Sequence, residues 1–291
     1  MEVTEGRIEA NGLLFAYLAA GPADGPLALC LHGFPDSAWT WRHLLPELAG
    51  AGYRAVAPFM RGYAPTEVAE DGRYFIGDLI ADSSALHEAL GGDDSAVLIG
   101  HDWGAAAGYP AAAFAPDRWR RLVTMAVPPP GAFATALLTN YEQLKRSWYF
   151  FFFQSPLADM VVANDDLAFI DRIWADWSPG FAAAEDLEYT KQSLRDPANL
   201  AAAIGYYRAN MGGVPPDDIA AEQAAASASP AVPTLYLHGA ADGCSGVELA
   251  AGVDAVLPPE SAVEIVDGAG HFLHLERPEE VNGHVVKFLS R

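Results

Sequence analysis

The chain has 291 residues, of which 51% are hydrophobic, and its 38 acidic and 17 basic residues give a formal net charge of −21. This length suits one large domain or two modest ones, and the apolar content is enough for a substantial core. A surface this negative repels phosphate backbones and anionic lipid headgroups, so we expect binding neither to nucleic acid nor to a membrane.

The cysteines and the first residues bear on the cellular compartment. Cys30 lies in an apolar run and Cys244 lies far from it in the sequence, a pattern that indicates neither a disulfide framework nor a metal-ligand cluster. No signal peptide is visible after Met1, and no apolar run is long enough to span a bilayer. We therefore expect a cytoplasmic protein with reduced thiols.

The first predicted element is a β-hairpin, because "GRIEA" and "LLFAYLA" flank Asn11-Gly12, a pair that tolerates the positive φ of a tight turn. Continuous apolar runs are typical of parallel strands that are buried on both faces. Six such runs follow: Leu27–Gly33, Tyr53–Phe59, Ser95–Gly100, Arg120–Val127, Pro233–Gly239 and Ser261–Gly268. Stretches such as "FIGDLIADSSALHEALGG" between them have a helical period, so the sequence predicts an α/β sheet.

The alternation of strands and helices stops after Val127. Residues 130–228 are rich in aromatics and helical in pattern, and they end in the low-complexity connector "AAEQAAASASPAVP" that runs on to Pro233. We interpret residues 130–228 as a helical cap domain inserted into a single α/β core domain, which residues 1–129 and 229–291 form.

The sequence Gly100-His101-Asp102-Trp103-Gly104 has the form G-x-nucleophile-x-G between a strand and a helix. In that arrangement the side chain of Asp102 projects from the top of the sheet. Aspartate is also common in turns and helix caps, so the motif alone leaves a purely structural role open.

Two further residues favour a catalytic role for Asp102. Asp242 follows one predicted strand and His271 follows the next, which gives nucleophile, acid and base in the chain order of α/β hydrolases. The N–H groups of Phe34 and Trp103 are the predicted oxyanion-hole donors. We also predict a cis peptide bond between Phe34 and Pro35, since tight turns of this kind often contain one.

The runs H-G-F-P at 32–35 and G-H-D-W-G at 100–104, together with the sites of Asp242 and His271, resemble the α/β-hydrolase-fold epoxide hydrolases and the related haloalkane dehalogenases. The resemblance implies the α/β-hydrolase fold, a mostly parallel eight-stranded sheet flanked by helices with an inserted cap. It also implies that Asp102 is the nucleophile, His271 the general base and Asp242 the residue that orients it. No cofactor or metal is expected, because the histidines show no convincing ligand spacing.

Two segments of the predicted cap resemble those of epoxide hydrolases. Tyr149 precedes an F-Q-x-P run and Tyr207 lies in a Y-R motif, so the resemblance implies a pair of phenols that donate hydrogen bonds to an epoxide oxygen. Tyr206 is the alternative to Tyr207 if the register differs by one residue, and packing between cap and core is the alternative role for each phenol. The predicted substrate contacts are Phe34, Pro35, Trp103, Trp148 and Phe152.

One stretch departs from the family. Its members usually carry an aspartate in a D-x-R-G-Y-G stretch, but here the sequence is Phe59-Met60-Arg61-Gly62-Tyr63-Ala64. We therefore expect Arg61 to lack that carboxylate partner.

The resulting prediction is an epoxide hydrolase that converts a small or medium apolar epoxide to a vicinal diol, with water as co-substrate and a covalent aspartyl ester as intermediate. Its oligomeric state is expected to be a monomer or a homodimer. Two alternatives stay open. One is a haloalkane or haloacid dehalogenase with the same triad, and the other is a non-catalytic ligand receptor on the same fold.

Overall fold

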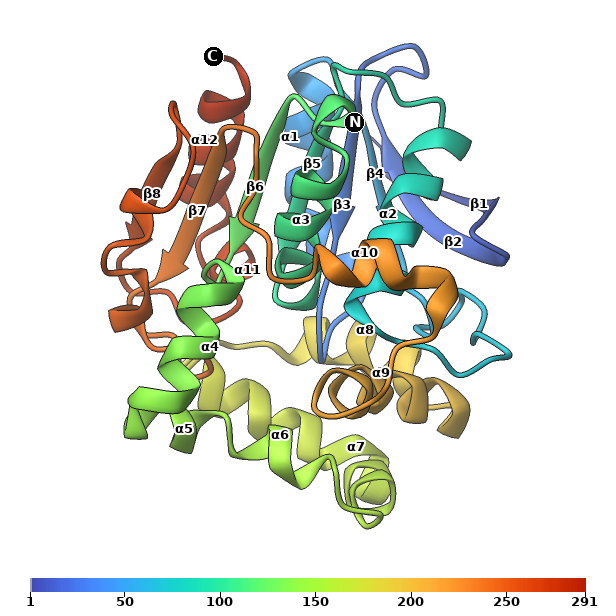
Figure 1. Cartoon of the computed structure of the whole chain (residues 1–291), viewed down its shortest axis with the longest axis vertical. Coiled ribbons are helices and arrows are strands. Elements are labelled where there is room, and N and C mark those ends of the chain that lie inside the picture. The colour runs from blue at the N-terminus through green and yellow to red at the C-terminus, as the bar shows by residue number, and fades with distance from the viewer. Residues whose placement is uncertain (1) are drawn as a thin grey trace.

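The computed structural model describes residues 2–291, whose strands form one eight-stranded sheet in the order β1-β2-β4-β3-β5-β6-β7-β8 (Figure 1). The strands are β1 Thr4–Ala10, β2 Leu13–Ala20, β3 Leu27–Leu31, β4 Arg54–Pro58, β5 Val97–His101, β6 Arg121–Met125, β7 Thr234–Gly239 and β8 Ala262–Val266. Only the pairings of β2 with β1 and β4 are antiparallel among these strands. The predicted mostly parallel, eight-stranded sheet is confirmed.

The predicted hairpin consists of β1 and β2. Asn11 and Gly12 connect them with φ values of 46° and 74°. Left-handed backbone at both central positions is the condition for the two-residue turn that matches the twist of the strands. The sequence pair therefore sets the hairpin register directly.

Burial across the sheet follows the apolar runs at its centre but not at one edge. Strands β3, β5, β6 and β7 are buried along their whole length. Strand β8 is an edge strand, and its Ile265 is 42% exposed. The expectation of burial on both faces is therefore wrong for β8. An edge strand has a neighbouring strand on one side only, so more of its surface is left in contact with solvent.

Helices cover both faces of the sheet. In Figure 1 the pair α2 and α3 lies in front of the sheet, and α1 and α12 lie behind it. Their bounds, with that of the short α11 before α12, are α1 Leu44–Gly50, α2 Ile76–Ala89, α3 Trp103–Phe114, α11 Leu273–Glu276 and α12 Pro278–Leu289. Helix α2 begins and ends within the stretch predicted to be helical, and its apolar residues Ile76, Leu79, Ile80 and Leu86 are buried.

In the described part of the chain, residues 2–291, the segment between β6 and β7 contains helices and connecting loops but no strand. These helices are α4 Pro130–Thr139, α5 Tyr141–Arg146, α6 Trp148–Phe152, α7 Ala158–Trp177, α8 Ala184–Leu194, α9 Pro197–Asn210 and α10 Ala220–Ala224. We call α4 to α10 the helical insertion. Most of it lies at the edge of the sheet toward which the β6 and β7 arrows point (Figure 1). No helix in the described chain has both the length and the apolar character required to cross a membrane.

Arg61 has a carboxylate partner after all. Its guanidinium makes a two-point ion pair with Asp82 of α2, at 2.6 Å from Nε and 2.7 Å from Nη2, and both side chains are buried. Asn11 of the hairpin turn donates to the same carboxylate. The aspartate of the family's local stretch is absent, as expected, and Asp82 of α2 supplies the charge that this stretch does not. A buried ion pair of this kind fixes geometry, and removing one partner typically costs about 3–5 kcal/mol.

Candidate active site

Asp102 lies at the turn between β5 and α3, with φ 51° and ψ −116°. Such backbone typically costs about 1–3 kcal/mol for a residue with a side chain. The flanking glycines make the turn possible. A Cβ on Gly100 would collide with the carbonyl group of Gly104, and a Cβ on Gly104 would collide with that of Leu31. The turn thus presents the Asp102 carboxylate at the end of the strand.

Asp102, His271 and Asp242 come together from the segments that follow β5, β8 and β7. His271 Nδ1 lies 3.0 Å from Asp242 Oδ2, and Nε2 lies 3.7 Å from Asp102 Oδ2. The other oxygen of Asp242 accepts from the N–H groups of Cys244 at 2.7 Å and Ser245 at 2.8 Å. Asp242 is therefore fixed by its own loop, and it orients the imidazole so that Nε2 faces Asp102.

The two aspartates govern the charge of His271. Burial opposes the imidazolium, but the charge of Asp242 and the contact with Asp102 outweigh it, so the pKa of His271 is well above its usual value. Burial also opposes ionisation of Asp102, yet the imidazolium of His271 holds the pKa of Asp102 below its usual value. The resting site thus favours an ionised nucleophile beside a protonated histidine.

One predicted oxyanion-hole donor contacts the nucleophile directly. The N–H of Phe34 donates to Asp102 Oδ1 at 2.7 Å. Gly33 allows this approach, since a Cβ there would collide with the Asp102 carboxylate. The Phe34–Pro35 bond is cis, as predicted. Trp103, the second predicted donor, is the first residue of α3, so its N–H lies at a helix N-terminus that favours negative charge.

A cavity of about 300 Å³ adjoins Asp102 and reaches into the helical insertion. Its apolar wall includes Ile76, Trp103, Val127, Phe133, Phe150 and Met211. A mostly apolar wall with a few converging polar groups is typical of a site for a small organic ligand. A groove of about 410 Å³ lies elsewhere, beside Trp39 and Tyr189, but none of its lining residues belongs to the triad.

Two tyrosines of the insertion face this cavity. Tyr149 and Tyr207 are buried, line the cavity and pack edge to face with ring centroids 5.5 Å apart. Tyr149 Oη lies 3.3 Å from Cys244 Sγ, while Tyr207 Oη has no hydrogen-bond partner among the described residues. Tyr206 instead donates to the carbonyl of Arg61 at 2.9 Å. Of the two adjacent tyrosines, Tyr207 is thus the one at the cavity.

Burial keeps both phenols protonated. It raises the pKa of Tyr149 and of Tyr207 well above the usual value, and the negative charge of Asp102 adds to the effect in each case. Both hydroxyls are therefore available as hydrogen-bond donors next to the carboxylate.

Several predicted substrate contacts lie outside the cavity lining. Trp148 is 46% exposed and packs on Phe152 and Phe169. Trp148 and Phe152 are four residues apart and share one face of α6, whereas Tyr149 and Phe150 line the cavity from another face. The expectation for Trp148 and Phe152 is corrected: an aromatic run on a helix cannot present every ring to one side.

Phe34 and Pro35 also do not line the cavity. Phe34 is fully buried and packs edge to face on Tyr207, so it supports the wall from behind. The carbonyl of Pro35 accepts from Trp174 Nε1 at 2.8 Å. Trp103 is the predicted substrate contact that does line the cavity.

The sequence did not indicate several of the wall residues. Phe133, Phe150 and Cys244 line the cavity, although no motif distinguishes them. Phe150 belongs to the aromatic run of 150–153, where knowledge of the helix face would have been needed to select it. Cys244 could have been found from its position, because residues just after an acid loop tend to lie beside the acid.

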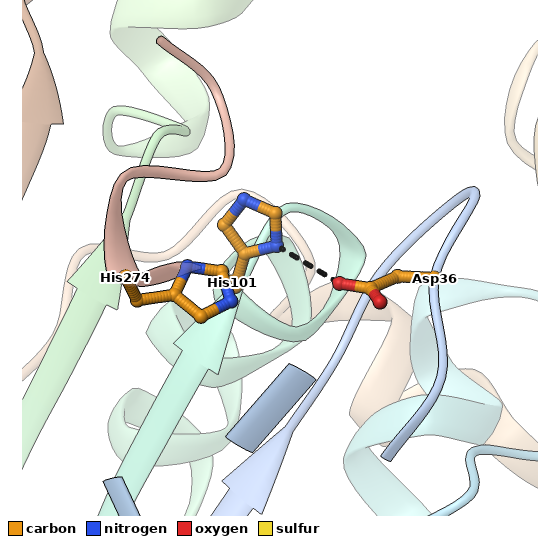
Figure 2. A group of neighbouring side chains, drawn as sticks. All are labelled: Asp36, His101 and His274. Atoms are coloured by element: carbon orange, nitrogen blue, oxygen red, sulfur yellow. Dashed lines mark ion pairs between the residues drawn. The ribbon is translucent and has the colours of Figure 1, made fainter. Parts of the chain in front are cut away.

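A second buried group contacts the backbone of His271 and consists of Asp36, His101 and His274 (Figure 2). His101 Nε2 donates to the carbonyl of His271 at 3.0 Å, and Nδ1 lies 3.9 Å from Asp36 Oδ2. Burial lowers the pKa of His101 to about 3. Ligand-type atoms of the three residues lie within 4.8 Å of one another, a proximity that sequence spacing did not reveal. The bond to the carbonyl of His271 gives His101 a role in anchoring the loop that carries the base.

Comparisons with known proteins identify the family and the fold of this chain. A family profile described as alpha/beta hydrolase fold matches residues 26–278. Epoxide hydrolase 4 of Mus musculus is 31% identical over 292 residues, which cover 98% of this chain and 78% of that protein. The structure of epoxide hydrolase A from Mycobacterium thermoresistibile is 28% identical and superposes with a TM-score of 0.81, covering 99% of this chain and 98% of that one.

A further solved structure is similar in fold. The haloalkane dehalogenase DbeA-M1 loop variant from Bradyrhizobium elkanii has a TM-score of 0.81 and 23% identity, covering 99% of this chain and 97% of that one. At this identity the likeness concerns the fold alone.

Proposed function

This chain belongs to the α/β-hydrolase family, among its epoxide hydrolases, and from that premise we propose that it opens small or medium apolar epoxides through a covalent ester on Asp102. The observation that carries the proposal is the pair of cavity-facing phenols, Tyr149 and Tyr207, beside a carboxylate at the elbow. The cavity of about 300 Å³ and its apolar wall support the substrate class.

In the first step an oxygen of Asp102 attacks an sp³ carbon of the epoxide, and the carbon–oxygen bond of the ring breaks. The leaving alkoxide stays attached to the substrate, so it needs a proton, which a phenol of Tyr149 or Tyr207 supplies. The phenolate regains a proton as the imidazolium of His271 loses one, which restores the phenol and leaves the imidazole neutral for the second step. A serine in place of Asp102 would leave an ether that water cannot readily cleave, whereas a carboxylate leaves an ester.

In the second step water hydrolyses the ester at the carboxyl carbon of Asp102. His271, oriented by Asp242 at 3.0 Å, takes a proton from that water, which adds to the carboxyl carbon. The tetrahedral intermediate then breaks its bond to the product oxygen, which takes the proton back from His271, and the freed carboxyl group of Asp102 ionises by passing its own proton to His271. The N–H groups of Phe34 and Trp103 stabilise the oxyanion that forms, and the loss of one such donor typically costs about 3–4 kcal/mol of transition-state stabilisation. Neither step needs a cofactor or a metal ion.

We further propose that residues 130–228 act as a cap domain on a catalytic core formed by residues 1–129 and 229–291. The absence of strands between β6 and β7 in the described chain supports this division, and so does the source of both phenols, which the helical insertion supplies. The cap would then provide the acid for ring opening, and the core would provide the nucleophile and the base.

The rate of ester hydrolysis should rise with pH. The general base must be neutral, and the pKa of His271 in the free enzyme is raised by both aspartates. Ester formation removes the charge of Asp102, so the pKa of His271 should be lower in the ester than in the free enzyme. We expect single-turnover hydrolysis rates to increase with pH and to level off above an apparent pKa below that of free-enzyme His271, measured by NMR. A hydrolysis rate that stays flat through the acid range would contradict this role.

The reaction class can be tested with a panel of aliphatic and aryl epoxides and haloalkanes, assayed for diol and halide together. We expect diol from epoxides and little halide from haloalkanes. In a single turnover in ¹⁸O-labelled water, the label should enter the carboxyl group of Asp102. Halide release without diol would favour a dehalogenase. Thermal stabilisation by epoxides without turnover would favour a ligand receptor.

A further inference from the structure

The end of α7 contacts the two loops that carry the acid and the base. The carbonyl oxygen of Trp177 accepts from the N–H of Gly243, the residue after Asp242, and from the N–H of His271 itself, both at 3.0 Å. One acceptor in the helical insertion therefore bonds to both loops. The position of this carbonyl therefore affects how the Asp242 and His271 loops lie relative to each other.

The neighbouring residue, Ser178, holds the base loop with its side chain. Ser178 Oγ accepts from the N–H of Phe272 at 3.1 Å and donates to Glu276 Oε1 at 2.7 Å. The Glu276 carboxylate in turn accepts from the N–H of Gly270 at 2.9 Å. Gly270 and Phe272 flank His271 in the chain. The Glu276 carboxylate holds the N–H of Gly270, and the Ser178 hydroxyl holds the N–H of Phe272.

Two glycines permit the close approach of α7. A Cβ on Gly243 would collide with the carbonyl group of Asp176, and a Cβ on Gly270 would lie within 2.6 Å of Ser178 Cα. Both Ser178 and His271 are buried, so water does not replace these contacts readily. The end of α7 is therefore packed against the two loops at van der Waals distance.

We propose that Ser178 is a positioning residue through which the helical insertion sets the general base for ester hydrolysis. We call the Trp177 carbonyl, the Ser178 hydroxyl and the Glu276 carboxylate the α7 clamp. The proposal rests on the proposed function, because it assigns the clamp to the second step of that mechanism. The first step uses Asp102 and the phenols, and neither the nucleophile nor a phenol hydrogen-bonds to Ser178 among the described contacts.

The test is the variant Ser178→Ala. It leaves the N–H of Phe272 without its acceptor and removes one of the two donors to Glu276, so His271 should be less well aligned for water activation. We expect ester hydrolysis to slow about tenfold to a hundredfold, in line with the effect of small misplacements of catalytic groups. Ester formation should stay within about twofold of wild type, so kcat and KM should fall together. Quenched single-turnover reactions followed by intact-mass spectrometry measure both steps.

Three further variants separate positioning from stability. Ser83→Ala removes a buried hydroxyl that donates to the carbonyl of Leu79 in α2, away from the site, and should leave both steps unchanged. Glu276→Gln keeps one oxygen acceptor and should slow hydrolysis less than Glu276→Ala does. This pair also tests the clamp if Ser178→Ala fails to fold.

Four results bear on the proposal differently. A folded Ser178→Ala protein that accumulates ester supports it. A folded Ser178→Ala protein that hydrolyses the ester at the wild-type rate overturns the clamp, as do equal losses in both steps. If neither the wild type nor His271→Gln ever forms an ester with an epoxide, the proposed function itself fails, which is a distinct outcome.

Discussion

Replacing His271 with glutamine is expected to leave ester formation nearly intact and to slow ester hydrolysis about 10³-fold, within the range that general bases contribute. Asp102 and the two phenols remain in place, so the epoxide can still be opened. Glutamine cannot accept a proton from water, so the ester persists. Intact-mass spectra after mixing with a reactive epoxide should show one added substrate mass on nearly every molecule.

The matched control for this variant is His284→Gln. His284 is half-buried in α12, outside the triad, and its replacement should hydrolyse the ester at the wild-type rate. If His271→Gln turned over at the wild-type rate without adduct, the general base would have to be another residue. Tryptic mapping of the adduct should identify Asp102 as the esterified side chain.

Removing both phenols should greatly lower the rate of ester formation, the first step. We expect Tyr149→Phe and Tyr207→Phe each to slow ester formation about tenfold to a hundredfold, and the double variant at least about 10³-fold, since a positioned acid contributes up to about 10⁴-fold. The remaining phenol can still protonate the alkoxide in each single variant, whereas in the double variant no phenol can. Rapid-quench measurement of ester formation gives these rates.

Tyr206→Phe is the control for the phenols. It deletes the hydroxyl that donates to the carbonyl of Arg61, so thermal stability should fall while ester formation stays near the wild-type rate. Should Tyr206→Phe slow ring opening as much as Tyr207→Phe does, the assignment of Tyr207 would be wrong. An unimpaired double variant would remove the phenols from the mechanism altogether.

The fold and the triad were predictable because both depend on local patterns. Apolar runs mark the strands, and the residues just after them must gather at one edge of a parallel sheet. Asp102, Asp242 and His271 follow three strands in this way, so their meeting was implied before any geometry was known. Their 3.0 Å and 3.7 Å separations agree with that logic.

Features that depend on the packing of distant segments were not predictable. The partner of Arg61 comes from α2, which the motif around Arg61 does not mention. The choice between Trp148 and Phe150 as a wall residue depends on how α6 is rotated about its axis. A helix of five residues is too short for its sequence to show a buried and an exposed face. The contact of Ser178 with the base loop joins residues that no sequence pattern relates.

The backbone of Asp102, at φ 51° and ψ −116°, has a consequence for how this protein ages and fails. The reactive carboxylate belongs to a residue whose backbone would relax if the strand β5 and the helix α3 around it loosened. Mild damage to the interior should therefore abolish catalytic activity before the overall fold is lost.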